Sequence, residues 1–221
     1  MMTHPEEHDV SAPAPGALSR RAAFKAGAAG FAAALLTLSH ITPALADELA
    51  RLAHGQPMTG ARLAEILRAE RVQWNALLDQ VGLDRMDIPD VEGEWSVKQL
   101  VAHLTWYEQA VVDGAQQVQS SGTFPRRRPT GMSMDEMNAQ IAEESRGRSA
   151  SDVLAEAQEV FERLLVVIEQ CPQDLLNDPR VLGLPDDTPP WMRVANNSYA
   201  HYRKHEPALR AWLAAQTEDQ E

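Results

Sequence analysis

Residues 93–104 read GEWSVKQLVAHL, and they mark the start of a long amphipathic helix. Ser96 is a residue type that caps helices, because its side-chain oxygen accepts a hydrogen bond from a free N–H group of the first turn. Beyond Ser96, apolar residues recur every three or four positions, at Val97, Leu100, Val101, Leu104 and Val111. This spacing places them along one helix face. The stretch therefore predicts a helix over residues 97–118 that buries one face in a core.

Other stretches show the same helical period. They cover residues 59–81, 149–170 and 189–215, and a shorter amphipathic helix is predicted over residues 134–145. Ser149 and Thr188 are the expected N-caps of the last two long helices, and Pro207 is a candidate kink in the last one. No alternating β-branched run is longer than a few residues, so strands are not expected. The chain is therefore predicted to fold as an all-α four-helix bundle with a short extra helix.

The N-terminal part resembles an export leader. Arg20 and Arg21 precede a weakly apolar, Ala/Gly-rich run, and Ala44-Leu45-Ala46 is a small-x-small cleavage site. The paired arginines resemble a twin-arginine signal, although Phe24 stands one place later than in the usual pattern. The apolar run is shorter than the roughly 20 residues of a membrane-spanning helix. This length favours a cleaved leader over an N-terminal anchor.

These observations predict a division of the chain. Residues 1–46 form the export signal, with cleavage after Ala46, and residues 47–58 form a linker. The bundle covers residues 59–215, and residues 216–221 form a tail. The mature protein is then expected in the periplasm without stable membrane insertion. The twin-arginine and general secretion routes both stay open.

The charge balance limits the classes of partner. The chain carries a formal net charge of −12. An acidic protein is repelled by nucleic-acid backbones and anionic membranes, so neither is expected as a partner. The basic cluster at residues 126–128 is small and indicates a solvated loop. The single cysteine, Cys171, excludes an internal disulfide and a thiolate metal cluster. The expected partner is a small molecule, and the oligomeric state stays open, a homodimer included.

Two histidines on the last predicted helix are the main candidate site residues. His201 and His205 are four residues apart, which places both imidazoles on one helix face about 6 Å apart along the axis. They fall inside the apolar stripe or at its edge, whereas Arg193, Arg203, Lys204 and Arg210 fall outside it. At this spacing two ring nitrogens can share a metal ion. The HExxH metalloprotease pattern is excluded, because a tyrosine follows the first histidine.

Further polar residues stand on predicted core faces. His103 flanks the apolar stripe of the second helix, with Tyr107 one turn later. Glu108 lies in the middle of that stripe and Glu70 lies on the core side of the first helix. An unpaired carboxylate is costly there. Glu108 is therefore expected to be the partner of a metal-bound histidine or a base.

Two stretches give the chain a family resemblance. Residues 93–104 resemble the G-x-W-S-V-K-x-L-x-A-H-L segment of DinB-like four-helix proteins, especially the ClbS/DfsB branch. The later stretch NSYAHYRKH, residues 197–205, is similar to the closing helix of that branch. The resemblance implies a four-helix bundle with a crossover connection. It also implies that His103, His201 and His205 hold a divalent ion, as in the metal-binding members.

The leader and the resemblance together suggest an exported metal-dependent enzyme. Three imidazoles suit Zn²⁺ or Ni²⁺ with an open position, where a water or thiol loses its proton more easily. The expected chemistry is hydrolysis or thiol transfer on a small reactive electrophile, with Glu108 or Tyr107 orienting the nucleophile. Candidate pocket walls are Trp95, Trp106 and Trp191. Two alternatives stay open: a protein of this fold that sequesters a small molecule without turnover, and a metal-free bundle whose histidines bond to Glu108 and Glu70.

Overall fold

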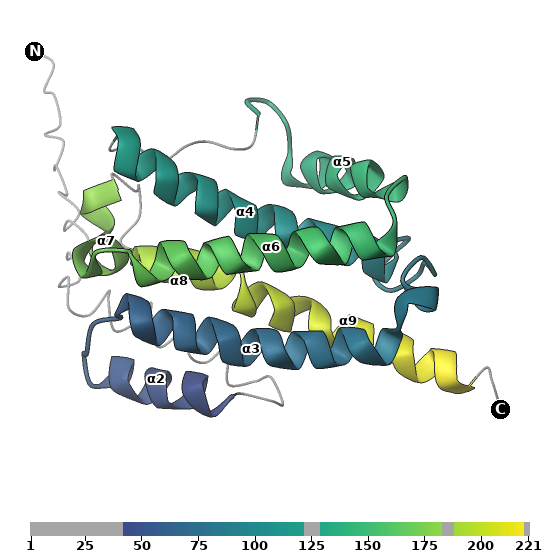
Figure 1. The fold of residues 1–221 in the computed structure, drawn as a ribbon, viewed down its shortest axis with the longest axis horizontal. Coiled ribbons are helices and arrows are strands. Elements are labelled where there is room, and N and C mark those ends of the chain that lie inside the picture. The colour runs from purple at the N-terminus through teal and green to yellow at the C-terminus, as the bar shows by residue number, and fades with distance from the viewer. Residues whose placement is uncertain (1–41, 122–128, 183–187, 219–221) are drawn as a thin grey trace, which may run out of the picture.

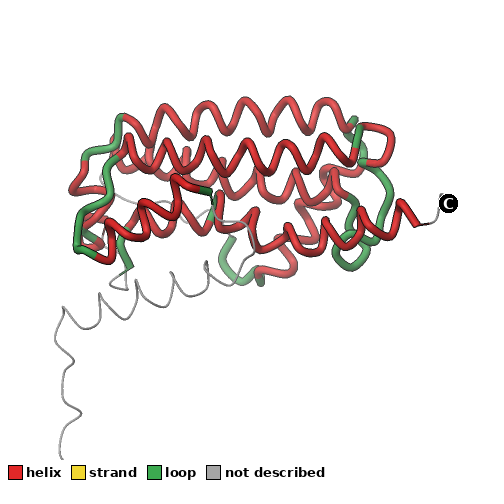
Figure 2. The backbone as a smooth tube through the Cα atoms, turned by 90° about the horizontal axis from the view of Figure 1, so that it is seen from below, coloured by secondary structure: helices red, strands yellow, loops and turns green. Residues whose placement is uncertain are grey.

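The computed structural model describes residues 42–121, 129–182 and 188–218 of the chain. The long helices of the bundle are α3 (Gly60–Val81), α4 (Val97–Ser121), α6 (Ala150–Glu169) and α9 (Tyr199–Glu218). Figure 1 shows α3, α4 and α6 side by side with α9 behind them, and Figure 2 shows from below that the helices follow one long axis. The described ranges contain no strand, only an isolated antiparallel bridge between Glu92 and Trp95. The predicted all-α class is confirmed.

Local capping explains where these helices begin. Ser96 and Gln99 cap α4 reciprocally: Ser96 N donates to Gln99 Oε1 at 3.0 Å, and Gln99 N donates to Ser96 Oγ at 3.3 Å. This is the arrangement of a capping box, which satisfies two backbone donors at once. The side chain of Ser149 accepts from Asp152 N at the start of α6, as predicted. The side chain of Thr59 does the same for α3.

The connection from α4 to α6 crosses over the bundle. Helix α5 (Met134–Arg146) lies on this connection and lets α6 begin at the same end of the bundle as α4 (Figure 1). A buried lysine joins the two starts, because Lys98 Nζ donates to the carbonyl oxygens of Arg146 and Arg148 at 3.2 and 2.8 Å. Helices α4 and α6 are therefore parallel, and the crossover expected from the family resemblance is confirmed.

The last helix is divided where one continuous helix was predicted. Helix α8 (Pro190–Asn196) ends one turn before α9 begins. Asn197 Nδ2 donates to the Arg193 carbonyl at 2.6 Å, and Ser198 Oγ donates to the Val194 carbonyl at 2.6 Å. Asn and Ser side chains compete with the helical backbone in this way, which explains the break.

One further detail of this region, the N-cap of α8, differs from the expectations. The N-cap of α8 is Pro189, with no side-chain cap bond, instead of Thr188. Helix α9 continues through Pro207. Ser198 starts it, because its carbonyl oxygen accepts from the backbone N–H of His201 and Tyr202 at 2.9 and 3.0 Å.

Residues predicted as leader end and linker form a further helix, α2 (Pro43–Ala53), packed on α3. The side chain of Thr42 caps it by accepting from Leu45 N at 3.3 Å. Leu45 is 1% exposed and belongs to the apolar core. The predicted cleavage site after Ala46 lies within this helix, and cleavage there would remove Thr42 and Leu45 from the bundle. The rest of the predicted leader, residues 1–41, lies outside the described residues.

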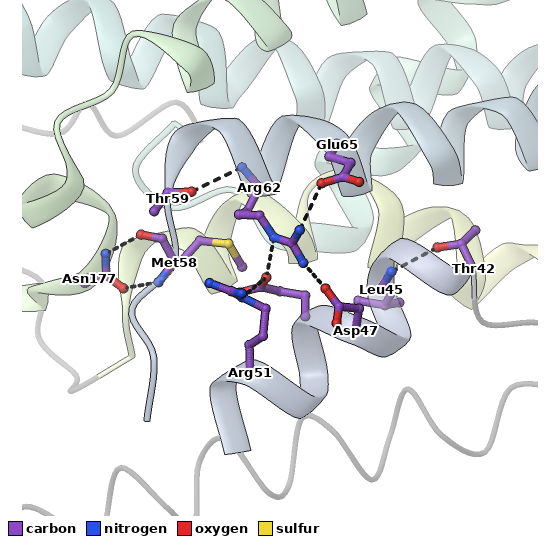
Figure 3. Close-up of polar contacts among 10 residues, drawn as sticks. Thr42, Leu45, Asp47, Arg51, Met58, Thr59, Arg62, Glu65 and Asn177 are labelled. Carbon is purple, nitrogen blue, oxygen red and sulfur yellow. Dashed lines mark hydrogen bonds and ion pairs between the residues drawn. The ribbon is translucent and has the colours of Figure 1, made fainter. Parts of the chain in front are cut away.

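An arginine of α3 fastens α2 to the bundle (Figure 3). Arg62 pairs with Asp47, and its Nε donates to Glu48 Oε2 at 3.1 Å. At the start of α3, Asn177 of α7 (Gln173–Asn177) holds Met58 by two bonds: Met58 N to Asn177 Oδ1 at 2.9 Å and Asn177 Nδ2 to Met58 O at 2.8 Å. Both ends of the predicted linker are thus fixed by side chains.

Candidate metal centre

The three predicted histidines meet in the structure. His103 comes from α4, and His201 and His205 come from the first turns of α9. His103 Nε2 and His201 Nε2 lie 3.2 Å apart. One ligand atom of each ring lies within 4.8 Å of the other two. The i, i+4 spacing and the packing of α4 against α9 therefore bring together side chains that are about a hundred positions apart in the sequence.

All three rings are buried, with exposed fractions of 3% for His103, 7% for His201 and 9% for His205. Within the described part of the chain, three of their nitrogens have no hydrogen-bond partner: Nδ1 of His103, Nδ1 of His201 and Nε2 of His205. Buried polar atoms are normally paired. Of these three, Nε2 of His205 belongs to a cluster in which one nitrogen of each ring lies within 4.8 Å of the others, and this convergence indicates a ligand site.

Burial keeps two of these rings, His103 and His201, neutral. Burial, followed by the charges of His205 and Lys204, lowers the pKa of His103 to about 3. Burial, followed by the neighbouring histidines and Lys204, lowers the pKa of His201 to about 2. Neutral imidazole is the form that binds metal ions. The two rings are thus ready to act as ligands at neutral pH without losing a proton.

A carboxylate that the sequence reasoning did not single out holds the third ring. His205 Nδ1 donates to Glu92 Oε2. This bond leaves the lone pair of His205 on Nε2, the nitrogen without a partner. Glu92 stands in the irregular stretch between α3 and α4, where helical periodicity makes no prediction. Its position beside the GEWS motif was the available signal.

Aromatic rings pack around the histidines. The ring centroid of Trp95 lies 5.0 Å from that of His103. Tyr107 lies 4.9 Å from His103 and 4.8 Å from His201, with an edge-on geometry. The hydroxyl of Tyr107 donates to Asn138 Oδ1 of α5 at 3.1 Å. The predicted candidate Tyr107 therefore lies at the histidine cluster.

The cluster opens onto a cavity of about 510 Å³. Besides the histidines and Glu92, its lining includes Trp95, Tyr107, Met134, Asn138, Asn196 and Lys204. Of the tryptophans predicted as walls, Trp95 lines this cavity. Trp106 lines a separate cavity between α4, α5 and α6, and Trp191 is packed in the apolar core. The site is therefore both enclosed by protein and accessible to a small molecule.

Glu108 lies elsewhere. Its side chain is fully buried, and its carboxylate accepts from the Tyr202 hydroxyl and, at 3.3 Å, from Arg71 Nη1. Burial raises the pKa of Glu108 to about 7, against the opposing effects of Arg71 and Tyr202. It does not line the histidine cavity. The structure thus places Glu108 in a closed network with Tyr202 and Arg71. The carboxylate that bonds to a histidine of the cluster, a role predicted for Glu108, is that of Glu92.

Glu70 has a different partner from the one considered. Arg203 donates to its carboxylate through Nε at 2.6 Å and Nη2 at 2.8 Å, and Thr42 Oγ1 donates at 2.6 Å. Arg203 was predicted to lie outside the apolar stripe and is only 2% exposed. The reason is that α3 packs against that side of α9 and supplies a buried carboxylate. The metal-free alternative, in which the histidines bond to Glu70 and Glu108, does not agree with the partners that these two carboxylates have in the structure.

The ligand set fits a divalent transition metal. Zinc binds imidazole nitrogens at about 2.1 Å, so two tetrahedral ligand atoms stand roughly 3.4 Å apart. The 3.2 Å between the Nε2 atoms of His103 and His201 is close to this separation. Imidazole nitrogens also suit nickel. With three protein ligands, a tetrahedral ion keeps one position for a molecule in the cavity.

A family model describes most of this bundle, matching the DinB superfamily over residues 66–206. The chain belongs to the DinB superfamily. This confirms the resemblance identified from residues 93–104 and 197–205. The matched residues include all three histidines of the candidate centre. No curated protein matches the chain.

Solved DinB-like structures share the fold. The colibactin self-resistance protein ClbS is 16% identical, with a TM-score of 0.59 over 70% of this chain and 95% of that chain. DfsB, described as a sibling lethal factor precursor, is 14% identical, with a TM-score of 0.60 over 72% and 97% of the two chains. An uncharacterised Escherichia coli UTI89 protein is 19% identical, with a TM-score of 0.60 over 73% and 96%. At these identities the likeness establishes the fold.

The ClbS structure corrects one expectation. The net charge of −12 predicts that nucleic acid is not a partner. ClbS has been solved in complex with double-stranded DNA. Net charge averages over the whole surface, whereas binding depends on the charges of one face. The exclusion of nucleic acid is therefore withdrawn.

Of the described helices, none combines the length and apolarity required to cross a bilayer.

Proposed function

We propose that this chain is a metal-dependent enzyme of the DinB superfamily that uses His103, His201 and His205 to act on a small reactive electrophile. The observation that carries the proposal is the convergence of three buried ring nitrogens at the wall of a cavity of about 510 Å³. Structural histidines in a core would be expected to pair their nitrogens with protein groups.

The donor set determines the chemistry. When bound, a divalent ion supplies Lewis acidity, which lowers the pKa of a neighbouring water or thiol and supplies a nucleophile. The chain contributes neutral ligands, because burial holds the pKa of His103 and His201 far below neutrality. Tyr107 touches both rings and has its hydroxyl fixed by Asn138. We assign the orientation of the nucleophile to Tyr107 and a structural role to Glu108.

The cavity lining is suited to a small molecule with apolar and polar parts. Trp95 and Met134 offer apolar surface, while Asn138 and Asn196 offer amide donors and acceptors. Lys204 is exposed and supplies a cation to the lining. Such a mixture of apolar walls and a few polar groups is typical of small-molecule sites. The combination supports hydrolysis or thiol transfer on an electrophile.

The test uses model electrophiles with purified protein. Hydrolysis is followed with 4-nitrophenyl acetate, and thiol transfer with 1-chloro-2,4-dinitrobenzene and cysteine, in zinc- or nickel-loaded and chelator-treated protein. The expected result is turnover that requires the metal and is lost in His201→Ala. The matched control is His54→Ala, because His54 is exposed just after the end of α2 and does not line the histidine cavity. Equal rates in loaded, chelated and His201→Ala protein would contradict the proposal. Tight retention of an unchanged compound would favour sequestration.

Export of the chain is a separate part of the proposal and rests on the leader sequence. The support is the arginine pair, Arg20 and Arg21, followed by the small-x-small site ending at Ala46. The test is the location of the protein in bacterial fractions, comparing wild type with the double variant Arg20→Lys, Arg21→Lys. Periplasmic wild type and retained variant are expected; retention of the wild type would contradict export.

A further inference from the structure

The turn before α4 has a fixed backbone. Val91 N donates to Trp95 O at 2.9 Å, and Trp95 N donates to Glu92 O at 3.3 Å, which closes residues 91–95 into a tight loop. Gly93 adopts φ +62°, a left-handed conformation that glycine accepts without steric cost. The motif glycine is therefore explained by the turn, and the two residues flanking it are held in set positions.

The turn is also fastened to the helices on both sides. Trp212 Nε1 of α9 donates to Pro89 O at 3.1 Å. Lys98 N, in the first turn of α4, donates to Met86 O at 2.9 Å. The segment before α4 thus has a defined position relative to α9, where His201 and His205 stand. A side chain on this turn can act as a rigid support for a residue of either helix.

Two side chains of the turn reach the histidine cluster. Glu92 accepts from His205 Nδ1, and the Trp95 ring lies against His103. The bond to Glu92 sets the tautomer of His205, because the proton on Nδ1 leaves the lone pair on Nε2. It also restricts rotation of the ring. In metal centres such a carboxylate orients the imidazole and raises its basicity.

We propose that Glu92 is a positioning residue of the metal centre, acting through His205. The turn 91–95 leads into α4, which carries His103, and through Glu92 it aims Nε2 of His205 on α9 at the nitrogens of His103 and His201. The role of the GEWS motif is thus to organise the centre. The inference rests on the proposed metal-dependent function, and it adds a residue outside the three ligands.

The chain offers a matched control two residues away. Glu94 is an exposed carboxylate on the same turn, and it does not line the histidine cavity. Replacing Glu92 or Glu94 by Gln changes the net charge equally. The side chain of Glu92 is 48% exposed, so its removal leaves no cavity in the core. Differences between the two variants therefore report the bond to His205.

The experiment measures metal affinity directly. Zinc affinity is obtained by competition with a chromophoric chelator for wild type, Glu92→Ala, Glu92→Gln and Glu94→Gln. Loss of such a partner typically lowers affinity about 10- to 100-fold. We expect that loss for Glu92→Ala, a smaller one for Glu92→Gln, whose amide oxygen can still accept from Nδ1, and less than a twofold change for Glu94→Gln. The visible spectrum of the Co²⁺-loaded protein should change in Glu92→Ala.

The outcomes separate this inference from the function on which it rests. If wild type binds no metal, the proposed function fails and this inference fails with it. If wild type binds zinc and Glu92→Ala binds it within twofold, with an unchanged Co²⁺ spectrum, the positioning role alone is overturned. Urea unfolding in chelator checks the fold of each variant. If Glu92→Ala is destabilised, the comparison of Glu92→Gln with Glu94→Gln decides the question by the same twofold criterion.

Discussion

The bundle contains two kinds of buried polar cluster, and they differ in how their atoms are paired. In one kind, Glu70 receives three hydrogen bonds from Arg203 and Thr42. In the other, the rings of His103, His201 and His205 keep unpaired nitrogens and face a cavity. The two clusters share α9, which carries Arg203 as well as His201 and His205. The difference indicates which cluster maintains the fold and which one is available to a ligand.

Glu108 belongs to the first kind. Arg71 and Tyr202 both donate to its carboxylate, Arg71 Nη2 also donates to Ala157 O at 2.9 Å, and the Tyr202 ring stacks on Trp74 at 5.4 Å. Burying a charge is tolerated when it is paired and hydrogen-bonded. A carboxylate on an apolar face, taken alone, therefore does not distinguish a catalytic acid from a structural one; its partners do.

Among single substitutions, the largest effect is expected from breaking the paired cluster. Glu70→Ala removes the carboxylate and leaves the guanidinium of Arg203 buried without its partner. Removing one member of a buried ion pair costs about 3–5 kcal/mol of the free energy of unfolding. Urea unfolding in the presence of a chelator measures the loss. A loss below about 1 kcal/mol would show that this cluster does not maintain the fold.

A somewhat smaller effect is expected from filling the unpaired cluster. A ligand that binds only the folded chain stabilises it by about 2.7 kcal/mol at a hundredfold excess over its Kd. Zinc should therefore raise the unfolding midpoint of wild type and of His54→Ala, and should not raise that of His201→Ala. An equal rise in all three proteins would place the ion outside the histidine cluster.

The pH dependence of metal-free protein sharpens the comparison further. The folded-state pKa values of His103 and His201 are lowered to about 3 and about 2, from 6.5. The unfolded chain therefore takes up protons at a pH where the folded chain does not. The resulting stability is present above pH 6.5 and is lost as pH falls toward those values.

Between pH 6 and pH 4 each ring should contribute a loss of about 1.4 kcal/mol per pH unit. Urea unfolding in chelator at several pH values, for wild type and for the double variant His103→Gln, His201→Gln, measures this contribution. The variant should show a shallower slope. Identical slopes would mean that the two imidazoles titrate in the folded protein as they do in the unfolded chain.

The smallest effect is expected at the surface. Arg68 of α3 and Glu169 of α6 form an ion pair at 2.6 Å, with half-exposed side chains. Exposed pairs contribute about 0.2–1 kcal/mol and are screened by salt. Arg68→Ala should lower the free energy of unfolding by that amount, and the difference should shrink in 1 M salt. A loss comparable to that of Glu70→Ala would remove the distinction between buried and surface pairs.

Much of this fold is predictable because it depends on local periodicity. Ser96 and Ser149 cap the helices expected of them, and the apolar stripes of α3, α4 and α6 lie in the core. The histidine cluster was also predictable, since the i, i+4 spacing fixes two rings and the motif around His103 supplies the third. Periodicity and motif are both properties of short stretches of sequence.

The missed features depend on long-range contacts or irregular backbone. Arg203 lies outside the apolar stripe by helical geometry, yet its long side chain reaches a carboxylate on α3. Glu92 stands on a turn, where no period applies. Most of helix α2 lies in residues predicted as leader end and linker. The sequence does not reveal this helix, because its packing depends on Arg62 of another helix. In each case the deciding partner is distant in sequence.

The central claim is that the three clustered histidines, His103, His201 and His205, hold a metal ion. Elemental analysis of protein loaded with zinc or nickel, dialysed and compared with His103→Ala, His201→Ala and His205→Ala tests it most directly. The account predicts a stoichiometric divalent ion in wild type and in His54→Ala, and its loss in each of the three cluster variants. Equal metal content in wild type and the three variants, or none in wild type, would contradict it.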